Sequence, residues 1–399
     1  MFGQGKSYIY NLFGTFFDKG LILIVAFIFT TYIPVNVFGE WSLFQQFIII
    51  GAGIIIAPGM NLFSRLFYRI KDYDNGLIIK YNTVVVISIL IFILVYGMYV
   101  QNLNLLLLQL LCMAVFMTYN YYSLSLRFKN RNREYFLISG SRFILFFIFG
   151  AVGIYIKGEL NLVWLLYSFL ISTLIIVIPV LNQFSIKNVK IENLFNDEIT
   201  TLMIYGLVGT FLNSVDKFAI ELKCGPWILG SYSYVVAITT ASNVLVEFLK
   251  KVHVPMLFRC YSENGVRNFH FSNTLKIQLI FLFALQILLP YIIIWLLYLV
   301  RGGLNPYLDF GWLYYVIFTQ GVSFALYSLY HFINPRFIYS QKTDMMIRGS
   351  LISIVIYVFM IFVLKNPSIL ELTLLRFQLL VFPVLFLWIK SLRIGYNER

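Results

Sequence analysis

The chain has 399 residues, of which 60% are hydrophobic and 12% are charged, and its formal net charge is +13. Its mean hydropathy is +0.84. No soluble domain of this size tolerates such a composition, so the sequence excludes a water-soluble enzyme and predicts an integral membrane protein.

Apolar stretches recur along the chain between polar or basic breaks. A helix needs about 20 apolar residues to cross the hydrocarbon core, and about twelve stretches meet this length. We therefore predict an all-α polytopic membrane protein. In chain order, the predicted spans are 8–33, 41–63, 78–100, 105–125, 135–156, 162–181, 199–220, 227–249, 277–300, 311–333, 349–364 and 372–390.

Basic residues gather in every second connection, beginning with 65–71, 127–133 and 250–267. This distribution argues against a nucleic-acid-binding surface, which would gather the charge on one face. Positive residues mark the cytoplasmic side of membrane proteins, so both termini are predicted to lie in the cytoplasm. Tryptophans near the outer ends of even-numbered spans, such as Trp41, are expected to anchor the outer interface.

The first and seventh spans share a pattern in which a Gly-Thr-Phe run precedes an Asp-Lys pair. The pairs are Asp18-Lys19 and Asp216-Lys217. This recurrence, with the polar segment 182–198 between the halves, predicts two pseudo-repeated six-helix bundles, 1–190 and 191–399, around a central cavity. An ionisable group at membrane depth costs about 2.5–3.5 kcal/mol, which favours a cavity-facing position for the pairs. The alternative is that the pairs lie near the membrane interfaces.

Five further side chains are interpreted here. Arg142 and Glu247 have two interpretations each, and Arg376, Tyr119 and Tyr330 have a structural one. Arg142 either reaches the cytoplasmic interface or lines the cavity, and Arg376 is expected to snorkel towards the outer surface. Glu247 has Lys251 at i+4, which favours an interfacial ion pair, with proton coupling as the alternative. Tyrosines near the cytoplasmic ends of spans, such as Tyr119 and Tyr330, are expected to form an interfacial belt.

Catalytic motifs are missing from the sequence. It contains no H-E-x-x-H, C-x-x-C or G-x-S-x-G pattern. Asp72-Tyr73-Asp74 has a spacing that can hold a divalent metal, but its short loop makes a solvated charge run the better interpretation. We therefore expect no enzymatic activity, no cofactor and no metal site.

One stretch carries a family resemblance. Asp216-Lys217-Phe218-Ala219-Ile220, then Gly225, Leu229-Gly230-Ser231-Tyr232-Ser233 and Pro255 with Arg259, resembles the seventh and eighth helices of Wzx-type O-antigen flippases. The segment from Gly59 to Arg65 is similar to the end of their second helix. The resemblance implies the multidrug/oligosaccharidyl-lipid/polysaccharide (MOP) exporter fold, in which two six-helix bundles surround a cationic cavity that opens alternately to either side.

The resemblance also implies a function. The implied cargo is an undecaprenyl-pyrophosphate-linked O-antigen repeat unit, flipped from the cytoplasmic to the periplasmic leaflet of the bacterial inner membrane during lipopolysaccharide biosynthesis. A polysaccharide polymerase and a chain-length regulator would be its protein partners.

The physics of moving a pyrophosphate through hydrocarbon selects the candidate residues. Fixed cations and a wet path are required, while the polyprenyl tail stays in membrane lipid. The candidate substrate-binding cations are Lys19, Arg142, Lys217, Arg65 and Arg259. The candidate residues for coupling to H⁺ or Na⁺ are the carboxylates Asp18, Asp216 and Glu247.

Two other functions compete with a flippase. A multidrug or cation antiporter of the same fold would favour acidic cavities, whereas these spans hold as many bases as acids. An O-antigen polymerase would display a large periplasmic loop, whereas the longest outer connection, 301–310, has about ten residues.

Overall fold

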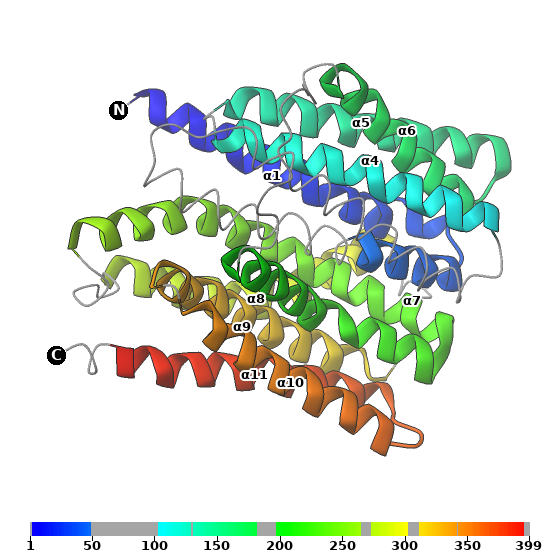
Figure 1. Cartoon of the computed structure of the whole chain (residues 1–399). Coiled ribbons are helices and arrows are strands. Elements are labelled where there is room, and N and C mark those ends of the chain that lie inside the picture. Colours follow the sequence, from blue (N-terminus) through cyan, green and yellow to red (C-terminus); the bar gives the residue numbers. More distant parts are fainter. Residues whose placement is uncertain are drawn as a thin grey trace. The chain divides into compact units, whose positions relative to one another are not determined.

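The structure is a computed structural model (Figure 1) that describes residues 2–48, 103–128, 131–181, 197–264, 273–301, 311–340 and 342–394. Regular secondary structure within these ranges is helical throughout. The chain divides into two compact units, Met1–Thr210 and Phe211–Arg399. The boundary predicted at residue 190 stays a prediction, because 182–196 lie outside the described ranges.

In its described part, the first unit has four long helices before α7. These are α1 (Phe2–Phe27), α4 (Leu103–Phe128), α5 (Asn132–Lys157) and α6 (Leu162–Leu181). A short 3-10 helix, η1 (Phe29–Thr31), and a helical segment at 35–48 follow α1. Glycines let α1 and α5 approach closely, since Gly140 of α5 packs against Phe17 of α1.

The second unit is built from most of α7 (Asp197–Asn264) and from α8 (Asn273–Arg301), α9 (Leu313–Tyr339), α10 (Thr343–Val363) and α11 (Ile369–Ile394). The helix α7 covers both the seventh and the eighth predicted spans. It bends at Gly225, whose φ of 81° and ψ of 172° are not helical. A positive φ suits glycine because it has no Cβ, so the break falls at this residue.

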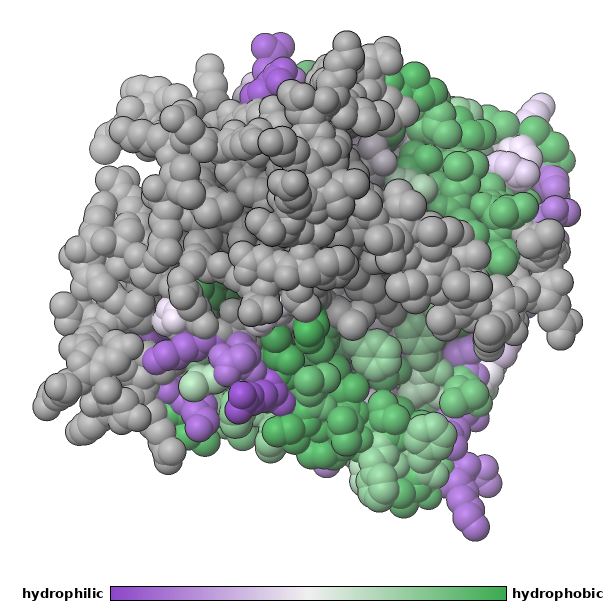
Figure 2. Space-filling view, viewed as in Figure 1, coloured by the Kyte–Doolittle hydropathy of each residue, from purple (hydrophilic) through white to green (hydrophobic). Residues whose placement is uncertain are grey.

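Six helices within the described ranges are long and apolar enough to cross a membrane. Large apolar side chains on them are exposed, including Ile280, Phe359 and Phe362. Hydrophobic residues cover much of the described surface in Figure 2, with hydrophilic residues in smaller patches. Such a surface suits lipid rather than water, in agreement with the predicted polytopic membrane protein.

Two aromatic residues expected at the membrane interfaces lie inside the units instead. Trp41 is buried, and its ring packs against Phe146 and Phe169. Tyr330 is also buried, and its hydroxyl lies 3.1 Å from the Ser350 hydroxyl. The expectation for both was wrong, because an aromatic residue near the end of an apolar stretch can equally face a neighbouring helix.

Candidate functional site

The first polar cluster surrounds Asp18 on α1. Its carboxylate accepts hydrogen bonds from the Tyr119 hydroxyl of α4 and, at 2.6 Å, from the Tyr135 hydroxyl of α5. The Tyr119 and Ser139 hydroxyls lie 3.0 Å apart. Arg142 of α5 places Nη1 3.9 Å from Asp18 Oδ1. Asp18 therefore has its partners on other helices, and Tyr119 is a buried ligand of this carboxylate rather than a belt tyrosine.

Arg142 lies inside the first unit and does not reach an interface. Its side chain is 3% exposed. The guanidinium carbon lies 4.4 Å from the ring centroid of Tyr119, 4.8 Å from that of Phe116 and 5.2 Å from that of Phe169. Aromatic faces attract a desolvated guanidinium, so these three rings stabilise the buried charge together with Asp18. Of its two predicted positions, the interfacial one is wrong.

Helical spacing brings this cluster together. Tyr135, Ser139 and Arg142 follow one another at i, i+4 and i+7, which places them on one face of α5. Gly14 lies one turn before Asp18 on α1. A Cβ at Gly14 would stand 2.6 Å from Tyr135 Cε1, so only glycine lets the tyrosine ring lie across α1.

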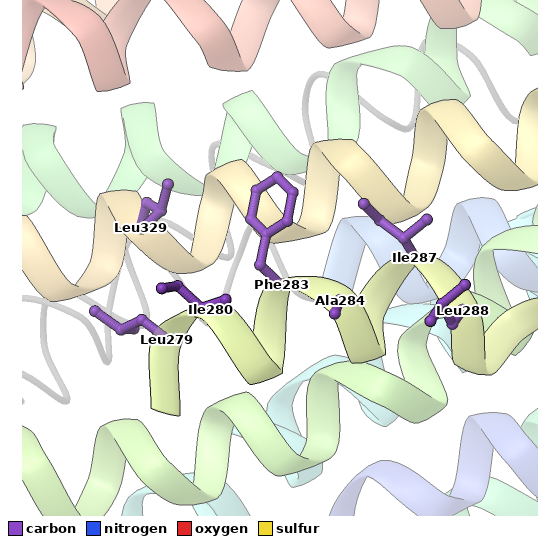
Figure 3. A pocket seen from close by; sticks show the side chains of 7 residues that line it. All are labelled: Leu279, Ile280, Phe283, Ala284, Ile287, Leu288 and Leu329. Carbon is purple, nitrogen blue, oxygen red and sulfur yellow. The ribbon is translucent and has the colours of Figure 1, made fainter. Parts of the chain in front are cut away.

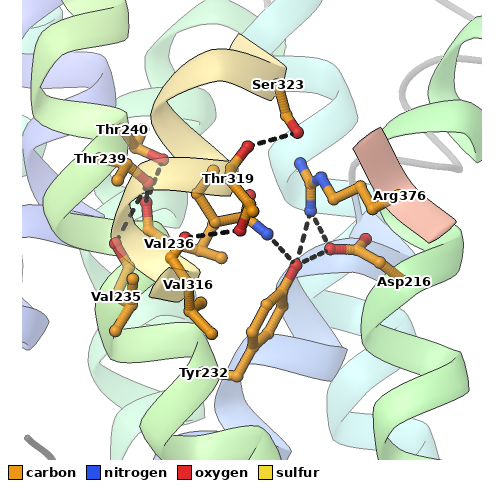
Figure 4. Close-up of polar contacts among 11 residues, drawn as sticks. Asp216, Tyr232, Val235, Val236, Thr239, Thr240, Val316, Thr319, Ser323 and Arg376 are labelled. Atoms are coloured by element: carbon orange, nitrogen blue, oxygen red, sulfur yellow. Dashed lines mark hydrogen bonds and ion pairs between the residues drawn. The ribbon is translucent and has the colours of Figure 1, made fainter. Parts of the chain in front are cut away.

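The second polar cluster surrounds Asp216 in the second unit (Figure 4). Asp216 Oδ2 accepts hydrogen bonds from the Tyr232 hydroxyl and from Arg376 Nη1. The Tyr232 oxygen in turn accepts from Arg376 Nη1 at 3.0 Å and from Gln320 Nε2. Both halves of α7 meet α9 and α11 at this point. All four side chains are buried.

The position of Arg376 corrects a prediction. It was expected to snorkel, but its side chain is 3% exposed and pairs with Asp216. The helix α11 begins with a capping box in which Ser368 N–H donates to Glu371 Oε2 at 2.7 Å and Glu371 N–H donates to Ser368 Oγ at 3.3 Å. Arg376 therefore lies two turns into the helix, within reach of a carboxylate whose neutralisation outweighs access to water.

The remaining predicted residues are placed less fully. Lys217 is 6% exposed and follows Asp216 on α7, about 100° around the helix. Lys19 lies in α1, and Glu247 and Arg259 lie in α7, but their side chains are outside the description. Arg65 lies outside the described residues. Their roles in binding cargo or ions stay predictions.

Polar residues of the second half of α7 bond mostly within their own helix. Thr239 donates to the carbonyl of Val235, and Thr240 donates to that of Val236, as Figure 4 shows. A further contact joins neighbouring helices, since Gln286 Nε2 of α8 donates to Ser328 Oγ of α9 at 2.9 Å. The hydroxyls of Thr239 and Thr240 are therefore satisfied within α7 itself.

An apolar groove of about 550 Å³ lies along α8 and α9 (Figure 3). Its lining is entirely hydrophobic: Leu279, Ile280, Phe283, Ala284, Ile287, Leu288 and Leu329. A surface of this composition suits hydrocarbon chains. Across the described ranges, no group of three or more His, Cys, Asp or Glu side chains could hold a metal ion.

No known protein family matches the sequence, and no curated protein matches it. Solved structures do match. An outward-facing multidrug resistance MATE family transporter of the MOP superfamily shares 14% identity, with 97% of this chain and 94% of that chain covered and a TM-score of 0.62. The chain has the MATE fold. An inward-facing structure of such a transporter gives a TM-score of 0.58 at 14% identity, covering 98% and 96%.

A eukaryotic MATE transporter matches as well, at 11% identity and a TM-score of 0.52, with 98% of this chain and 96% of that chain covered. The predicted MOP exporter fold is therefore confirmed. The MATE fold together with the six apolar helices makes this a multi-pass membrane protein.

Proposed function

We propose that this chain is an alternating-access membrane transporter whose cargo is an O-antigen or related repeat unit linked to undecaprenyl pyrophosphate. It would act in the bacterial inner membrane with both termini in the cytoplasm, and deliver its product to a polymerase and a chain-length regulator. The MATE fold supports transport. The Wzx-like stretch from Asp216 to Arg259 supports the cargo.

One observation favours an anionic cargo. Both aspartates of the two polar clusters have a buried arginine partner, Arg142 for Asp18 and Arg376 for Asp216. A cationic cargo would need a carboxylate whose charge is not already neutralised. Lys217, the next residue of α7, is a further buried base in the second unit. A pyrophosphate complements buried bases of this kind through strong hydrogen bonds to ionised donors.

The coupling ion belongs to the same proposal. Asp18, Asp216 or Glu247 would exchange H⁺ or Na⁺ during the cycle, since a carboxylate is the side chain that can bind either ion. Each charge moved across the membrane then contributes about 2.3 kcal/mol per 100 mV.

A multidrug or cation antiporter is the second candidate. The specific observation in its favour is that the matched structures include multidrug resistance MATE family transporters. These matches do not distinguish between the two cargoes, because a sequence identity of 14% shows only that the fold is shared.

The deciding experiment compares native cells with cells that lack the protein. The amount and sidedness of lipid-linked single repeat units are measured, and surface polysaccharide is followed on a gel. A flippase predicts units that accumulate facing the cytoplasm and a loss of polymer. Unchanged units and polymer, with a gain in sensitivity to cationic drugs, would establish the antiporter instead. A plasmid copy of the gene must restore the wild-type result in either case.

A further inference from the structure

We propose that Arg376 binds an oxyanion of the cargo, and that Asp216 closes this site until a proton neutralises it. The inference rests on the proposed function for the identity of the anion, a phosphoryl group. In the described state, the Asp216 carboxylate takes the place of the cargo oxygens. Arg376 is not among the cations that the sequence alone suggested.

The ion pair leaves hydrogen-bonding capacity unused on both sides. Arg376 engages Asp216 Oδ2 and the Tyr232 oxygen through the single nitrogen Nη1. Among the residues that the structure describes, neither the buried Nε of Arg376 nor the buried Oδ1 of Asp216 has a hydrogen-bond partner. An arginine and a carboxylate that serve only stability are expected to form two parallel bonds and to satisfy their remaining atoms. An ion pair formed through one arginine nitrogen is better suited to exchanging its carboxylate for another anion.

The donors around Asp216 Oδ2 suit a phosphate oxygen. Arg376 Nη1 and the Tyr232 hydroxyl already donate to an oxyanion at this position. The guanidinium is planar and offers a second donor in Nε, a geometry that matches two oxygens of one phosphate. Gln320 fixes the Tyr232 hydroxyl by donating to its oxygen. Displacement of Asp216 therefore leaves a ready set of donors from α7 and α11.

The surroundings of Asp216 explain why a proton is needed. Across from it, α11 contributes Arg376, the second half of α7 contributes Tyr232, and α9 contributes the neutral Gln320. Tyr357 of α10 faces Tyr232, and on its own helix Asp216 is followed by Lys217 and Glu221. Asp216 is 1% exposed, so a carboxylate that has lost Arg376 to an anion would be a buried charge beside a like charge. Such a carboxylate takes up a proton.

Anion binding and proton uptake are consequently linked, with one proton taken up at Asp216 for each anion bound to Arg376. The proton and the anion then cross the membrane together. The membrane potential acts on their summed charge.

The test is calorimetric titration of inorganic pyrophosphate into the purified full-length protein between pH 5.5 and 8. Repeating it in buffers of different ionisation enthalpy counts the protons taken up. The expected result is about one more proton per pyrophosphate for the wild type than for Asp216→Asn, which cancels the protonation of the probe itself. Asp216→Asn is also expected to bind more tightly at pH 8. Asp344→Asn, which removes an exposed carboxylate in the first turn of α10, is the control and should behave like the wild type.

Arg376→Lys keeps a cation for Asp216 but removes the guanidinium fork. It is expected to weaken pyrophosphate binding at least tenfold while proton uptake persists, and it serves as the test should Asp216→Asn not fold. Equal proton uptake in the wild type and Asp216→Asn, or unchanged affinity in Arg376→Lys, would overturn the inference. If repeat units accumulate in cells without the protein but the titrations give either of these results, the flippase function is supported and the Asp216 switch is refuted. If the titrations give the expected results but repeat units do not accumulate in cells without the protein, the Asp216 switch is supported and the cargo is another anion.

Discussion

Replacing Gly14 with alanine tests how the crossing of α1 and α5 holds Asp18. The new Cβ would lie 2.6 Å from Tyr135 Cε1 and 2.7 Å from Cδ1. Ordinary carbon contacts are about 3.5–4.0 Å, so the ring must move by about 1 Å. Tyr135 is fully buried, and its hydroxyl donates to Asp18 at 2.6 Å. The ring therefore cannot move without loosening that hydrogen bond.

The magnitude follows from three contributions. Overpacking a closely packed contact costs about 1–3 kcal/mol. Losing a hydrogen bond to a charged carboxylate costs about 1.5–3 kcal/mol. Alanine recovers about 1 kcal/mol of helix propensity relative to glycine. The Gly14→Ala variant should be less stable than the wild type by about 1.5–5 kcal/mol.

The assay is thermal unfolding of the purified protein in detergent, followed by tryptophan fluorescence. The chain supplies a matched control in Gly209, the glycine of the second Gly-Thr-Phe run. No atom of the described residues lies within 4 Å of a Cβ added there. Gly209→Ala should leave stability unchanged or raise it by up to about 1 kcal/mol. Equal effects of the two substitutions, or a Gly14→Ala variant as stable as the wild type, would refute the contact with Tyr135.

Two further predictions concern the arginines and the start of α11. Arg376→Leu should destabilise the protein by about 3–5 kcal/mol, because it leaves the buried Asp216 carboxylate without its cation. Arg142→Leu should destabilise it less, because Asp18 is 19% exposed and keeps two tyrosine donors. Melting temperatures of the two variants check this order, and the reverse order would contradict it. Ser368→Ala should lower stability by about 0.5–2 kcal/mol through loss of the capping box; unfolding of Ser368→Thr, which keeps the hydroxyl, is the comparison.

The sequence predicted the helices well, and their ends less well. The span predicted at 162–181 coincides with α6, whereas α9 continues six residues past the predicted end at 333. Hydropathy measures how much of a helix lies in hydrocarbon, and a helix can continue through the polar interface where hydropathy falls. The polar residues Asn334 and Arg336 stay helical for this reason.

The sequence singled out the two acids of the clusters and Arg142, but not the other side chains around them. Asp18 and Asp216 stood out because a carboxylate in an apolar segment is costly. Arg376 and Tyr119 were not assigned as partners of these acids, because Arg376 is 160 residues from Asp216, and Tyr119 is 101 residues from Asp18. Hydropathy gives the depth of a residue along its helix but not the direction its side chain faces. Which tyrosine or arginine meets a buried acid depends on helix rotation and packing, and one sequence does not encode these as a spacing.

The two clusters hold their aspartates with the same types of side chain, but these side chains come from different helices. Ahead of each aspartate, a threonine of the Gly-Thr-Phe run donates to the carbonyl four residues earlier, at 2.7 Å for both Thr15 and Thr210. A tyrosine then donates to the following aspartate, and an arginine lies beside it. The arginine comes from the fifth predicted span in the first unit and from the last in the second. The two units therefore pair a similar acid with arginines from spans that do not correspond.

The two aspartates are also held by different sets of side chains. Asp18 accepts from two tyrosines while its arginine stays 3.9 Å away among aromatic rings, so hydroxyls hold that carboxylate. Asp216 has one tyrosine and a direct contact with Arg376. Moving the arginine therefore changes the charge balance of the second unit far more than that of the first. A switch that works by separating an acid from its base therefore belongs at Asp216 rather than at Asp18.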